Sequence, residues 1–320
     1  MHIRRFTLAF LIVATFAAAS RLTAQRTATT ATAAFQIPTV NDTSLLWRIT
    51  GEGIERPSYL FGTIHLIPSD DYFLEPSVVG AINDTDEVLF EIDPREMQNP
   101  AAMMGLMGKI NMRGDTSLED LLTPARYDSV STYFAATGLP MFMLNRMKPM
   151  FLSAMVGQDM SGGGPFGGAG GNGMQSYEFE LSEIAETAGR PISGLETMDF
   201  QLSLFDSIPY SVQADMLYKA VASETGDEMK TGDSDLERMV AMYKRRAVAE
   251  MSQLITDESA GYGNFEELLV VRRNEKWVPT IIDRLAATPS TYAVGAGHLG
   301  GAHGVIALLR ANGYTVEPVY

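Results

Sequence analysis

Short apolar runs, separated by turn residues, mark the first elements of the chain. Ser44 to Thr50 (SLLWRIT) and Ser58 to His65 (SYLFGTIH) are rich in aromatic, aliphatic and β-branched residues, with glycines and a proline between them. This pattern predicts a hairpin or two neighbouring strands. Glu75 to Asn83 then fits a short helix, and Glu87 to Asp93 (EVLFEID) fits a buried strand. This succession of strand, helix and strand is typical of an α/β sheet.

Helical periodicity dominates from Tyr177 onward. Apolar stripes at helical spacing predict helices over Tyr177 to Ala188, around Val212 to Val221, and over parts of a longer helix from Leu236 to Ile255. A strand from Pro191 to Leu195 separates the first two helices. The stripes are most simply interpreted as core-facing.

The end of the chain returns to alternating strands and helices. Asn264 and Glu267 form a capping pair for a helix that reaches Leu285, with Pro279 kinking or dividing it. Gly313 suits the C-terminal cap of a later helix. The closing strand, helix and strand are expected at Thr291 to Val294, His303 to Arg310 and Tyr314 to Val319. Together the elements predict an α/β (α+β) fold, in which a mixed central sheet is flanked by helices.

The stretch from Met97 to Met174 departs from this alternation. It holds twelve of the 19 methionines and ends in Gly162 to Gly173, a segment with eight glycines. Methionine packs adaptably and glycine raises chain entropy, so the stretch is not expected to form the core of a sheet. We expect a helical Met/Gly-rich insertion at about 97–174 with a surface loop. A lid that captures substrate and a methionine copper site are alternatives for the same segment.

The N-terminus has the features of a secretory signal. Arg4 and Arg5 precede the apolar run Phe6 to Ala19, and Ala24 is a suitable cleavage residue. The run is shorter than the ~20 residues that span a bilayer. We expect a signal peptide at 1–24, a flexible leader at 25–43 and a single domain at 44–320. The mature protein is then periplasmic or secreted, without a transmembrane anchor. A twin-arginine signal is the alternative to a general secretory one.

Composition narrows the possible chemistry. The 320 residues include no cysteine, which excludes disulfide frameworks, thiol nucleophiles and cysteine-ligated zinc or iron–sulfur centres. Any metal must therefore be held by nitrogen and oxygen ligands. With 24 Lys+Arg against 39 Asp+Glu, the net charge of −15 disfavours nucleic acid and anionic membranes as partners. The sequence does not indicate an oligomeric state.

Two copies of one motif carry two of the four histidines. Gly62 and His65 belong to GTIHL, while Gly295, Gly297 and His298 belong to GAGHL, and each motif follows an apolar strand. Ligand crevices of α/β sheets form at the carboxyl ends of strands, and glycine lets backbone or ligand approach closely. We therefore expect both imidazoles to converge on one crevice.

The strand EVLFEID adds carboxylates to this pair. Side chains alternate along a strand, so Glu91 and Asp93 are expected on the same side near its carboxyl end. His65, His298 and a carboxylate form a set that binds a divalent ion such as Mn²⁺, Co²⁺, Zn²⁺ or Fe²⁺. If Glu91 is a ligand, Asp93 orients a ligand or manages protons. If Glu91 is the general base, Asp93 is expected to hydrogen-bond to a metal ligand without binding the ion itself.

Structural interpretations compete with this one. A lone histidine at a strand end is usually a hydrogen-bonded structural residue, but the repeated motif and the paired carboxylates favour a functional site. His303 is expected to be a surface or capping residue.

The glycines from Gly295 to Gly300 also match a dinucleotide-binding GxGxxG motif. Only Tyr314 to Tyr320 follow the next helix, so the further strands of such a fold are missing. A backbone anion site at this turn remains an alternative.

Several segments together resemble a known family. They are LLWRIT, SYLFGTIHL, EVLFEID, Gly194 to Thr197 (GLET), Arg273 with Asn274, and YAVGAGHLGGAHGVIALLRANGYTVEPV. The chain resembles TraB/GumN family proteins, which are related to the Tiki proteases, over most of Leu45 to Val319. Only the Met/Gly-rich insertion departs from the family pattern.

The resemblance implies a function for named residues. Tiki proteins carry two Gly-x-x-His motifs and an acidic residue needed for metal-dependent proteolysis, which correspond to His65, His298 and Glu91. Arg273 and Asn274 match an Arg-Asn segment that is expected to hold a substrate carboxylate or to support the ligands. Glu196 of the GLET segment is expected to be structural.

The function expected from residues and resemblance is that of an exported metal-dependent hydrolase acting on a peptide or protein substrate. Fold alone does not fix activity, because the wider superfamily also includes esterase-like enzymes, a haem-binding lipoprotein and proteins proposed to sequester peptide pheromones. A noncatalytic envelope protein that binds metal, haem or peptide is the first alternative. A structural partner in envelope assembly is the second.

Overall fold

The computed structural model describes residues 37–39, 42–99, 105, 108–153, 155–156, 173–226, 235–259 and 264–320. The expected signal peptide at 1–24, most of the expected leader at 25–43, and residues 162–172 of the glycine-rich segment lie outside this part of the chain. None of the helices in the described residues is both long enough and apolar enough to cross a bilayer.

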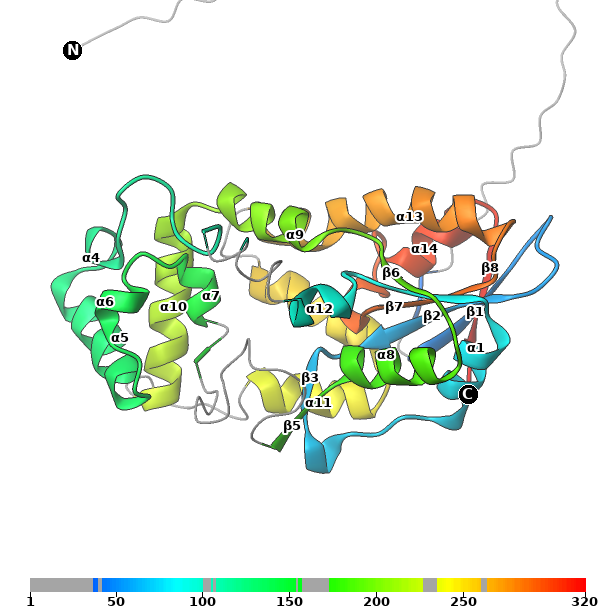
Figure 1. The fold of residues 1–320 in the computed structure, drawn as a ribbon, viewed down its shortest axis with the longest axis horizontal. Helices are drawn as coiled ribbons and strands as arrows, with labels where there is room; N and C mark the ends of the chain where they lie inside the picture. Colours follow the sequence, from blue (N-terminus) through cyan, green and yellow to red (C-terminus); the bar gives the residue numbers. More distant parts are fainter. Residues whose placement is uncertain are drawn as a thin grey trace, which may run out of the picture. The chain divides into compact units, whose positions relative to one another are not determined.

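A mixed six-stranded sheet organises the fold, as predicted, with strand order β6-β4-β7-β2-β1-β8. Strands β6, β4, β7 and β2 run parallel to one another, whereas β1 is antiparallel to both β2 and β8. The strands are β1 (Leu46–Thr50), β2 (Ser58–Thr63), β4 (Glu87–Phe90), β6 (Ile192–Gly194), β7 (Ser290–Gly295) and β8 (Thr315–Val319). The carboxyl ends of β2, β4 and β7 therefore meet at one edge (Figure 1).

The register of the sheet sets the two Gly-x-x-His motifs side by side. β1 and β2 form the expected hairpin, with Leu46 opposite Phe61. In the parallel pair of β2 and β7, Gly62 lies opposite Val294 and Thr63 opposite Gly295. Residues distant along the chain thus leave the sheet at neighbouring positions.

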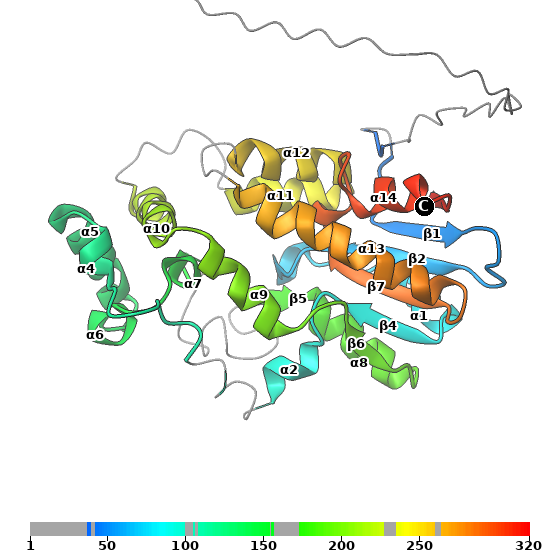
Figure 2. The ribbon, with the colours of Figure 1, turned by 90° about the horizontal axis from the view of Figure 1, so that it is seen from above.

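Helices cover both faces of the sheet. The helices α1 (Pro76–Asp84) and α8 (Tyr177–Thr187) lie on one side, and α13 (Arg272–Leu285) and α14 (Val305–Ala311) lie on the other (Figures 1 and 2). Each turns an apolar stripe inward; in α1 the buried residues Val78, Ala81 and Ile82 recur at helical spacing. The sheet and these helices share one apolar core, which includes both tryptophans.

Four helices lie beyond the carboxyl edge of the sheet (Figure 2): α2 (Pro94–Gln98), α9 (Met198–Leu204), α11 (Asp235–Lys244) and α12 (Val248–Ser259). The described residues also include the short 3₁₀ turns η1 (Ser69–Asp71), η5 (Phe205–Ser207) and η7 (Ala296–His298). A two-stranded sheet, which the sequence did not predict, pairs β3 (Leu66–Pro68) with β5 (Met174–Ser176).

Three expected elements differ from the structure. The segment from Leu236 to Ile255 forms α11 and α12 rather than one helix, because Arg246 adopts a left-handed φ of 58° that reverses the chain. Strand β4 ends at Phe90, not Asp93. A helix opens after Asn264 as expected, with the backbone N–H of Leu268 donating to the carbonyl of Asn264 at 3.0 Å, but the side chains of Asn264 and Glu267 form no capping hydrogen bonds among the described residues. The helix passes through a π-helical segment, η6 (Glu267–Val271), into α13, and Pro279 lies inside α13 without dividing it.

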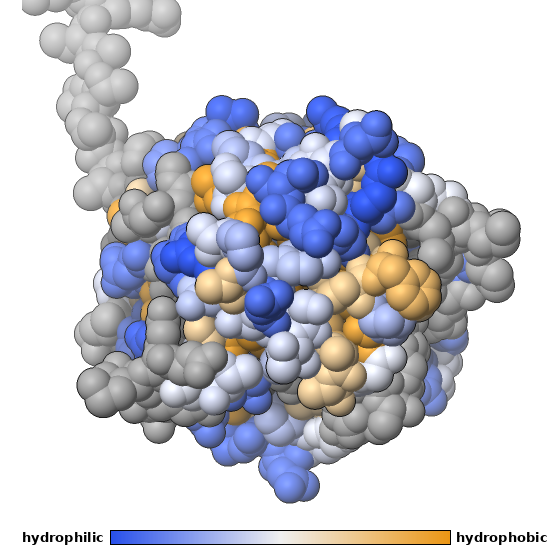
Figure 3. Space-filling model, turned by 90° about the vertical axis from the view of Figure 1, so that its left-hand side faces the viewer, coloured by the Kyte–Doolittle hydropathy of each residue, from blue (hydrophilic) through white to orange (hydrophobic). Residues whose placement is uncertain are grey.

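The Met-rich insertion is helical, as predicted. Its described part contains α4 (Leu118–Leu121), α5 (Pro124–Ala136), α6 (Met141–Leu144) and α7 (Pro149–Ser153). These helices share a second apolar cluster with α10 (Tyr210–Thr225), which lies outside the expected insertion. Figure 3 views this side of the molecule, where apolar side chains lie among polar ones. Phe142 and Met143 are the most exposed large apolar side chains of this cluster's helices.

Candidate active site

The carboxylate of Glu91 lies where β4 and β7 leave the sheet. Glu91 directly follows β4 and is buried, and its Oε1 accepts a hydrogen bond of 2.7 Å from the backbone N–H of Gly295. Its Oε2 accepts from Gln201 at 3.3 Å and from the guanidinium of Arg273. Burial is the largest single influence on Glu91 and would raise its pKa, but Arg273, the two histidines and the hydrogen bond from Gly295 together outweigh burial and hold the pKa well below its ordinary value.

His298 lies beside this carboxylate, at the end of η7. Its Nε2 is 3.8 Å from Oε1 of Glu91, and its ring is 4.6 Å from the ring of Trp277. The Nδ1 of His298 is 2.7 Å from Oδ1 of Asn274, whose amide nitrogen donates to the carbonyls of His298 and His303. Because this nitrogen donates, Oδ1 is the acceptor and the proton of the neutral ring is on Nδ1. Burial lowers the pKa of His298 to about 3, so the ring is neutral, and the lone pair of its Nε2 accepts from Nη1 of Arg273 at 3.1 Å.

His65 approaches from the end of β2. Its side chain is 66% exposed, and its Nδ1 lies 2.9 Å from Oε1 of Glu178. The carboxylate of Glu178 raises the pKa of His65 to about 9. Water screens part of this attraction because the ring is exposed. A carboxylate only accepts hydrogen bonds, so Nδ1 donates and Nε2 is the nitrogen left for another partner.

Gly295 leaves room for the three side chains to converge. A Cβ at this position would lie 3.2 Å from Oε1 of Glu91, 3.5 Å from Cδ2 of His298 and 3.8 Å from Nε2 of His65. Any side chain here would fill the space between the two imidazoles and the carboxylate. The structure thus brings together the three residues that the motifs predicted.

Gly62 and Gly297 permit close packing around the site. A Cβ on Gly62 would lie 2.8 Å from Leu299 Cδ1 and 3.1 Å from Ala296 Cα, so the first motif packs directly against the second. A Cβ on Gly297 would meet Cδ1 of Ile255 in α12 at 2.2 Å. Both glycines are therefore required by packing around the site.

Arg273 provides a buried positive charge behind the site. Its Nε and Nη2 donate to Oε1 of Glu196 at 2.9 and 2.7 Å, and its Nη1 lies 3.1 Å from Nε2 of His298. Glu196 also accepts from the indole of Trp277 at 3.1 Å. The arginine is thus held between Glu196, Glu91 and His298. Arg273 and Asn274 contact the site directly, and Glu196 holds Arg273 in place.

Asp93 does not join the three converging residues. The predicted alternation of Glu91 and Asp93 along a strand is wrong, because β4 ends at Phe90 and the chain then turns into α2. The Oδ1 of Asp93 accepts the backbone N–H of Arg95 at 3.0 Å and caps α2, and its carboxylate also pairs with the side chain of Arg95. His303 is exposed and precedes α14.

Two residues that sequence reasoning did not select contact the site. Glu178 binds His65, and Gln201 in α9 binds Glu91. Both lie more than a hundred positions from their partners along the chain, so no local spacing signals these contacts. Thr197 of the GLET segment caps α9, so this short stretch carries both Glu196, which binds Arg273, and Gln201.

The donor atoms suit a divalent ion held by nitrogen and oxygen. His65 and His298 each donate from Nδ1 to an oxygen, the arrangement that commonly orients metal-binding imidazoles through Nε2. Among the described residues, no three His, Asp or Glu side chains already stand at coordinating spacing. The guanidinium of Arg273 supplies the positive charge beside His298 and Glu91 in this arrangement. The residue types of this set are those that hold a divalent ion through nitrogen and oxygen, but Nε2 of His298 and Oε2 of Glu91 both face the guanidinium of Arg273 in this structure.

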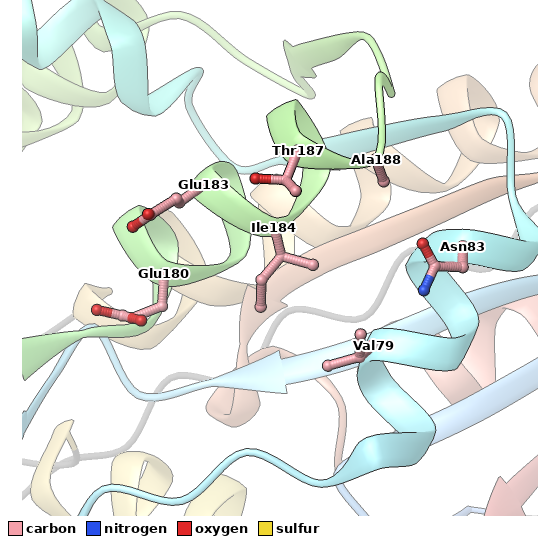
Figure 4. A pocket seen from close by; sticks show the side chains of 7 residues that line it. All are labelled: Val79, Asn83, Glu180, Glu183, Ile184, Thr187 and Ala188. Atoms are coloured by element: carbon pink, nitrogen blue, oxygen red, sulfur yellow. The ribbon is translucent and has the colours of Figure 1, made fainter.

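A separate cavity lies between α1 and α8. Its volume is about 520 Å³, and its lining includes Val79, Asn83, Glu180, Glu183 and Ile184 (Figure 4). None of the converging residues lines it. The cavity is therefore distinct from the site at the carboxyl edge of the sheet.

The chain has a distant relative among characterised proteins. The chain is similar to a protein named Metalloprotease TIKI1 from Danio rerio, with 21% identity over 329 aligned residues. The alignment covers 86% of this chain but 63% of that protein, so the chain spans less than two thirds of its length. No solved structure matches significantly.

The family comparison covers nearly all of the fold described above. The sequence model of the TraB/PrgY/gumN family matches residues 45–318, from the first strand of the sheet to the last. Both Gly-x-x-His motifs and the residues that surround Glu91 lie inside this match. The chain belongs to the TraB/PrgY/gumN family.

Proposed function

We propose that this protein is an exported, metal-dependent hydrolase that cleaves peptide or related amide bonds. The observation that carries the proposal is the convergence of His65, Glu91 and His298 at the carboxyl ends of three parallel strands. The similarity to a protein named as a metalloprotease supports the same reaction class. His65, His298 and Glu91 would hold the ion, which is Mn²⁺, Co²⁺, Zn²⁺ or Fe²⁺.

The residues of the site have different tasks in this reaction. When bound, a divalent ion polarises a carbonyl and lowers the pKa of water to about 7. His298 stays neutral at pH 7 because burial lowers its pKa, so its Nε2 carries a lone pair, which would bind the ion in place of the hydrogen bond from Arg273. Glu91 stays ionised and is a weak proton acceptor, because its pKa lies well below the ordinary value. Glu91 therefore suits a ligand better than a general base.

Charge and access complete the arrangement. Arg273 places a positive charge beside His298 and Glu91, where negative charge would develop on the carbonyl oxygen of a substrate. His65 is largely exposed, whereas Glu91 and His298 are buried. A peptide would therefore approach from the side of His65 and reach the buried groups last.

Metal content and peptide cleavage test the proposal together. The purified protein is assayed for bound metal, stripped with a chelator, and incubated with a peptide library in the presence of each candidate ion. We expect chelator-sensitive cleavage, and a loss of about 10²-fold or more in His65→Ala, His298→Ala and Glu91→Gln. His303→Ala is the matched control, because His303 is an exposed histidine outside the convergence.

The outcomes separate this function from the alternative. Binding of metal or haem without cleavage of any peptide supports a noncatalytic binding protein instead. Full cleavage by a folded variant that lacks both His65 and His298 contradicts any role for the site. Circular dichroism confirms that each variant is folded before its activity is compared.

Export is tested independently of catalysis. If the signal is removed after Ala24, the protein recovered from outside the cytoplasm begins at Gln25. Mass spectrometry of its N-terminal peptide decides this. A protein that retains Met1 and stays in the cytoplasm contradicts export but leaves the chemistry of the site open to test.

A further inference from the structure

Glu178 is the residue through which α8 contacts His65. Oε1 of Glu178 accepts from Nδ1 of His65 at 2.9 Å and from Oγ1 of Thr63 at 2.8 Å. Its other oxygen, Oε2, accepts from the hydroxyl of Ser176 at 3.2 Å. Both carboxylate oxygens are thus engaged, and one of them is shared between the histidine and a residue of its own motif.

The small sheet brings these residues together. In the pairing of β3 with β5, Leu66 lies opposite Ser176. His65 immediately precedes Leu66, and Glu178 follows Ser176 by two residues, at the start of α8. The pairing therefore fixes the distance between the first Gly-x-x-His motif and the first turn of α8.

The surroundings of Glu178 differ from those of a surface ion pair. Exposed pairs usually contribute little, because long side chains must be ordered in water. Here the hydrogen-bond donors Thr63 and Ser176 are buried, and they fix the carboxylate before His65 binds it. The first turn of a helix also favours a negative charge. The buried donors hold the acceptor in place, and the imidazole is the more exposed partner of the pair.

We infer that Glu178 is a positioning residue, which holds His65 with its proton on Nδ1 and its Nε2 free for the converging site. The role of Glu178 in catalysis rests on the proposed function, whereas its control of the His65 ring does not. A carboxylate at Nδ1 fixes which ring nitrogen carries the proton and the rotation of the ring. Without it, the exposed ring loses the contact that orients it.

Three substitutions separate orientation from charge and from folding. Glu178→Ala removes the acceptor. Glu178→Gln keeps a carbonyl oxygen that can accept from Nδ1 but removes the negative charge. Glu180→Ala is the matched control, since Glu180 lies on the same helix but lines the cavity between α1 and α8 (Figure 4). Thermal unfolding and circular dichroism establish that all three variants are folded.

The first measurement is the position of the ring proton. Protein with ¹⁵N-labelled histidine is stripped of metal and studied by NMR at alkaline pH, where the imidazole is neutral, and His65 is assigned from the spectrum of His65→Gln. We expect a protonated Nδ1 in the unchanged protein, in Glu178→Gln and in Glu180→Ala. Glu178→Ala is expected to show protonated Nε2 or a mixture. An Nδ1–H signal in Glu178→Ala that equals that of the unchanged protein overturns the inference.

The second measurement is metal affinity, with Zn²⁺ and Co²⁺ in competition with a chromogenic chelator. Loss of a partner of this kind typically weakens metal affinity or activity by about 10- to 100-fold. We expect such a loss in Glu178→Ala, a smaller loss in Glu178→Gln and no change in Glu180→Ala. Rescue by Gln assigns the effect to the hydrogen bond, whereas equal loss in Ala and Gln overturns the tautomer role.

Failure of the inference and failure of the proposed function give different results. If the unchanged protein binds neither ion and cleaves no peptide, the proposed function fails, and the NMR spectra still decide whether Glu178 orients His65. If the unchanged protein is an active metalloenzyme and Glu178→Ala is equally active with the same ring proton, the function stands and the positioning role is excluded.

Discussion

At the scale of single residues, different surroundings give the two histidine rings different charges. His298 is enclosed, and the loss of water around its ring lowers its pKa to about 3. His65 is exposed beside Glu178, whose charge raises its pKa to about 9. At pH 7 the metal-free site therefore combines a neutral imidazole, an imidazolium and an ionised carboxylate. Identical motifs thus hold chemically different side chains, because their surroundings differ.

The lowered pKa of His298 predicts a loss of stability in acid. The unfolded chain takes up this proton near pH 6.5, whereas the folded chain resists it until about pH 3. Stability is therefore intact above pH 6.5 and falls as the pH drops toward 3, by at most about 1.4 kcal/mol per pH unit. We expect His298→Gln to lack this contribution, so that its free energy of unfolding falls less between pH 6.5 and pH 4.

Urea unfolding of chelator-treated protein at several pH values measures this difference. Other groups titrate in both proteins, so the comparison isolates the contribution of His298. His303→Gln is the control, because this exposed histidine is expected to change the pH dependence little. A constant difference between the unchanged protein and His298→Gln across the acid range would show that the imidazole is not buried in its neutral form.

Arg273 predicts a second effect at this scale, on stability. Its guanidinium lies between two buried carboxylates, Glu91 and Glu196. Removing it leaves both negative charges without the positive charge that pairs with them. We expect Arg273→Met to lower the free energy of unfolding by roughly 3–5 kcal/mol. Arg48→Met, which breaks an exposed pair with Glu317, is expected to cost about 0–1 kcal/mol. Urea unfolding at pH 7 compares the two, and equal losses would contradict the buried network.

At the scale of elements, the spacing of apolar residues predicts those helices and strands that depend on contacts between residues near in sequence. The hairpin of β1 and β2 and the helix α8 follow from alternation and helical spacing, and they appear as expected. The break between α11 and α12 does not, because it depends on a left-handed Arg246 that binds Glu75, which is distant in sequence. The site is divided in the same way. Both motifs are visible in the sequence, but their contacts with Glu178 and Gln201 require the folded chain.

The turn η7 and the helix α12 yield a prediction at this scale. A Cβ on Gly300 would meet the backbone oxygen of Val248 at 2.6 Å, which cannot move without shifting α12. On Gly297 it would meet only the end of the Ile255 side chain. Overpacking typically costs about 1–3 kcal/mol, so we expect Gly300→Ala at the upper end of this range and Gly297→Ala at the lower.

A double variant tests the assigned cause. Shortening Ile255 to Val removes the Cδ1 atom that the new methyl would meet. Ile255→Val is therefore expected to recover part of the stability lost in Gly297→Ala and none of that lost in Gly300→Ala. Urea unfolding of the single and double variants supplies the comparison. Recovery in both backgrounds, or in neither, contradicts the contacts described for these two glycines.

At the scale of the whole molecule, two apolar clusters hold different sets of elements together. One contains the sheet and the helices that cover it, and the residues of the site leave its carboxyl edge. The other joins α10 to the helices of the Met-rich insertion. The sequence predicted a helical insertion from composition. It did not predict that α10 completes its core, because the stripe of α10 shows only that the helix has a buried face.

The separation of the two clusters predicts that each can unfold locally while the other stays folded. Leu217 in α10 belongs to the insertion cluster and Leu309 in α14 to the sheet cluster, and both are fully buried. Each Leu→Ala change is expected to lower the free energy of unfolding by about 2–5 kcal/mol.

Leu217→Ala should speed amide hydrogen exchange in α5, α7 and α10 while β7 stays protected, because the removed contacts lie within one cluster. Leu309→Ala should speed exchange in β1 and β7. Equal acceleration throughout the described residues in both variants would show that the clusters unfold together, so the insertion would not open independently of the site.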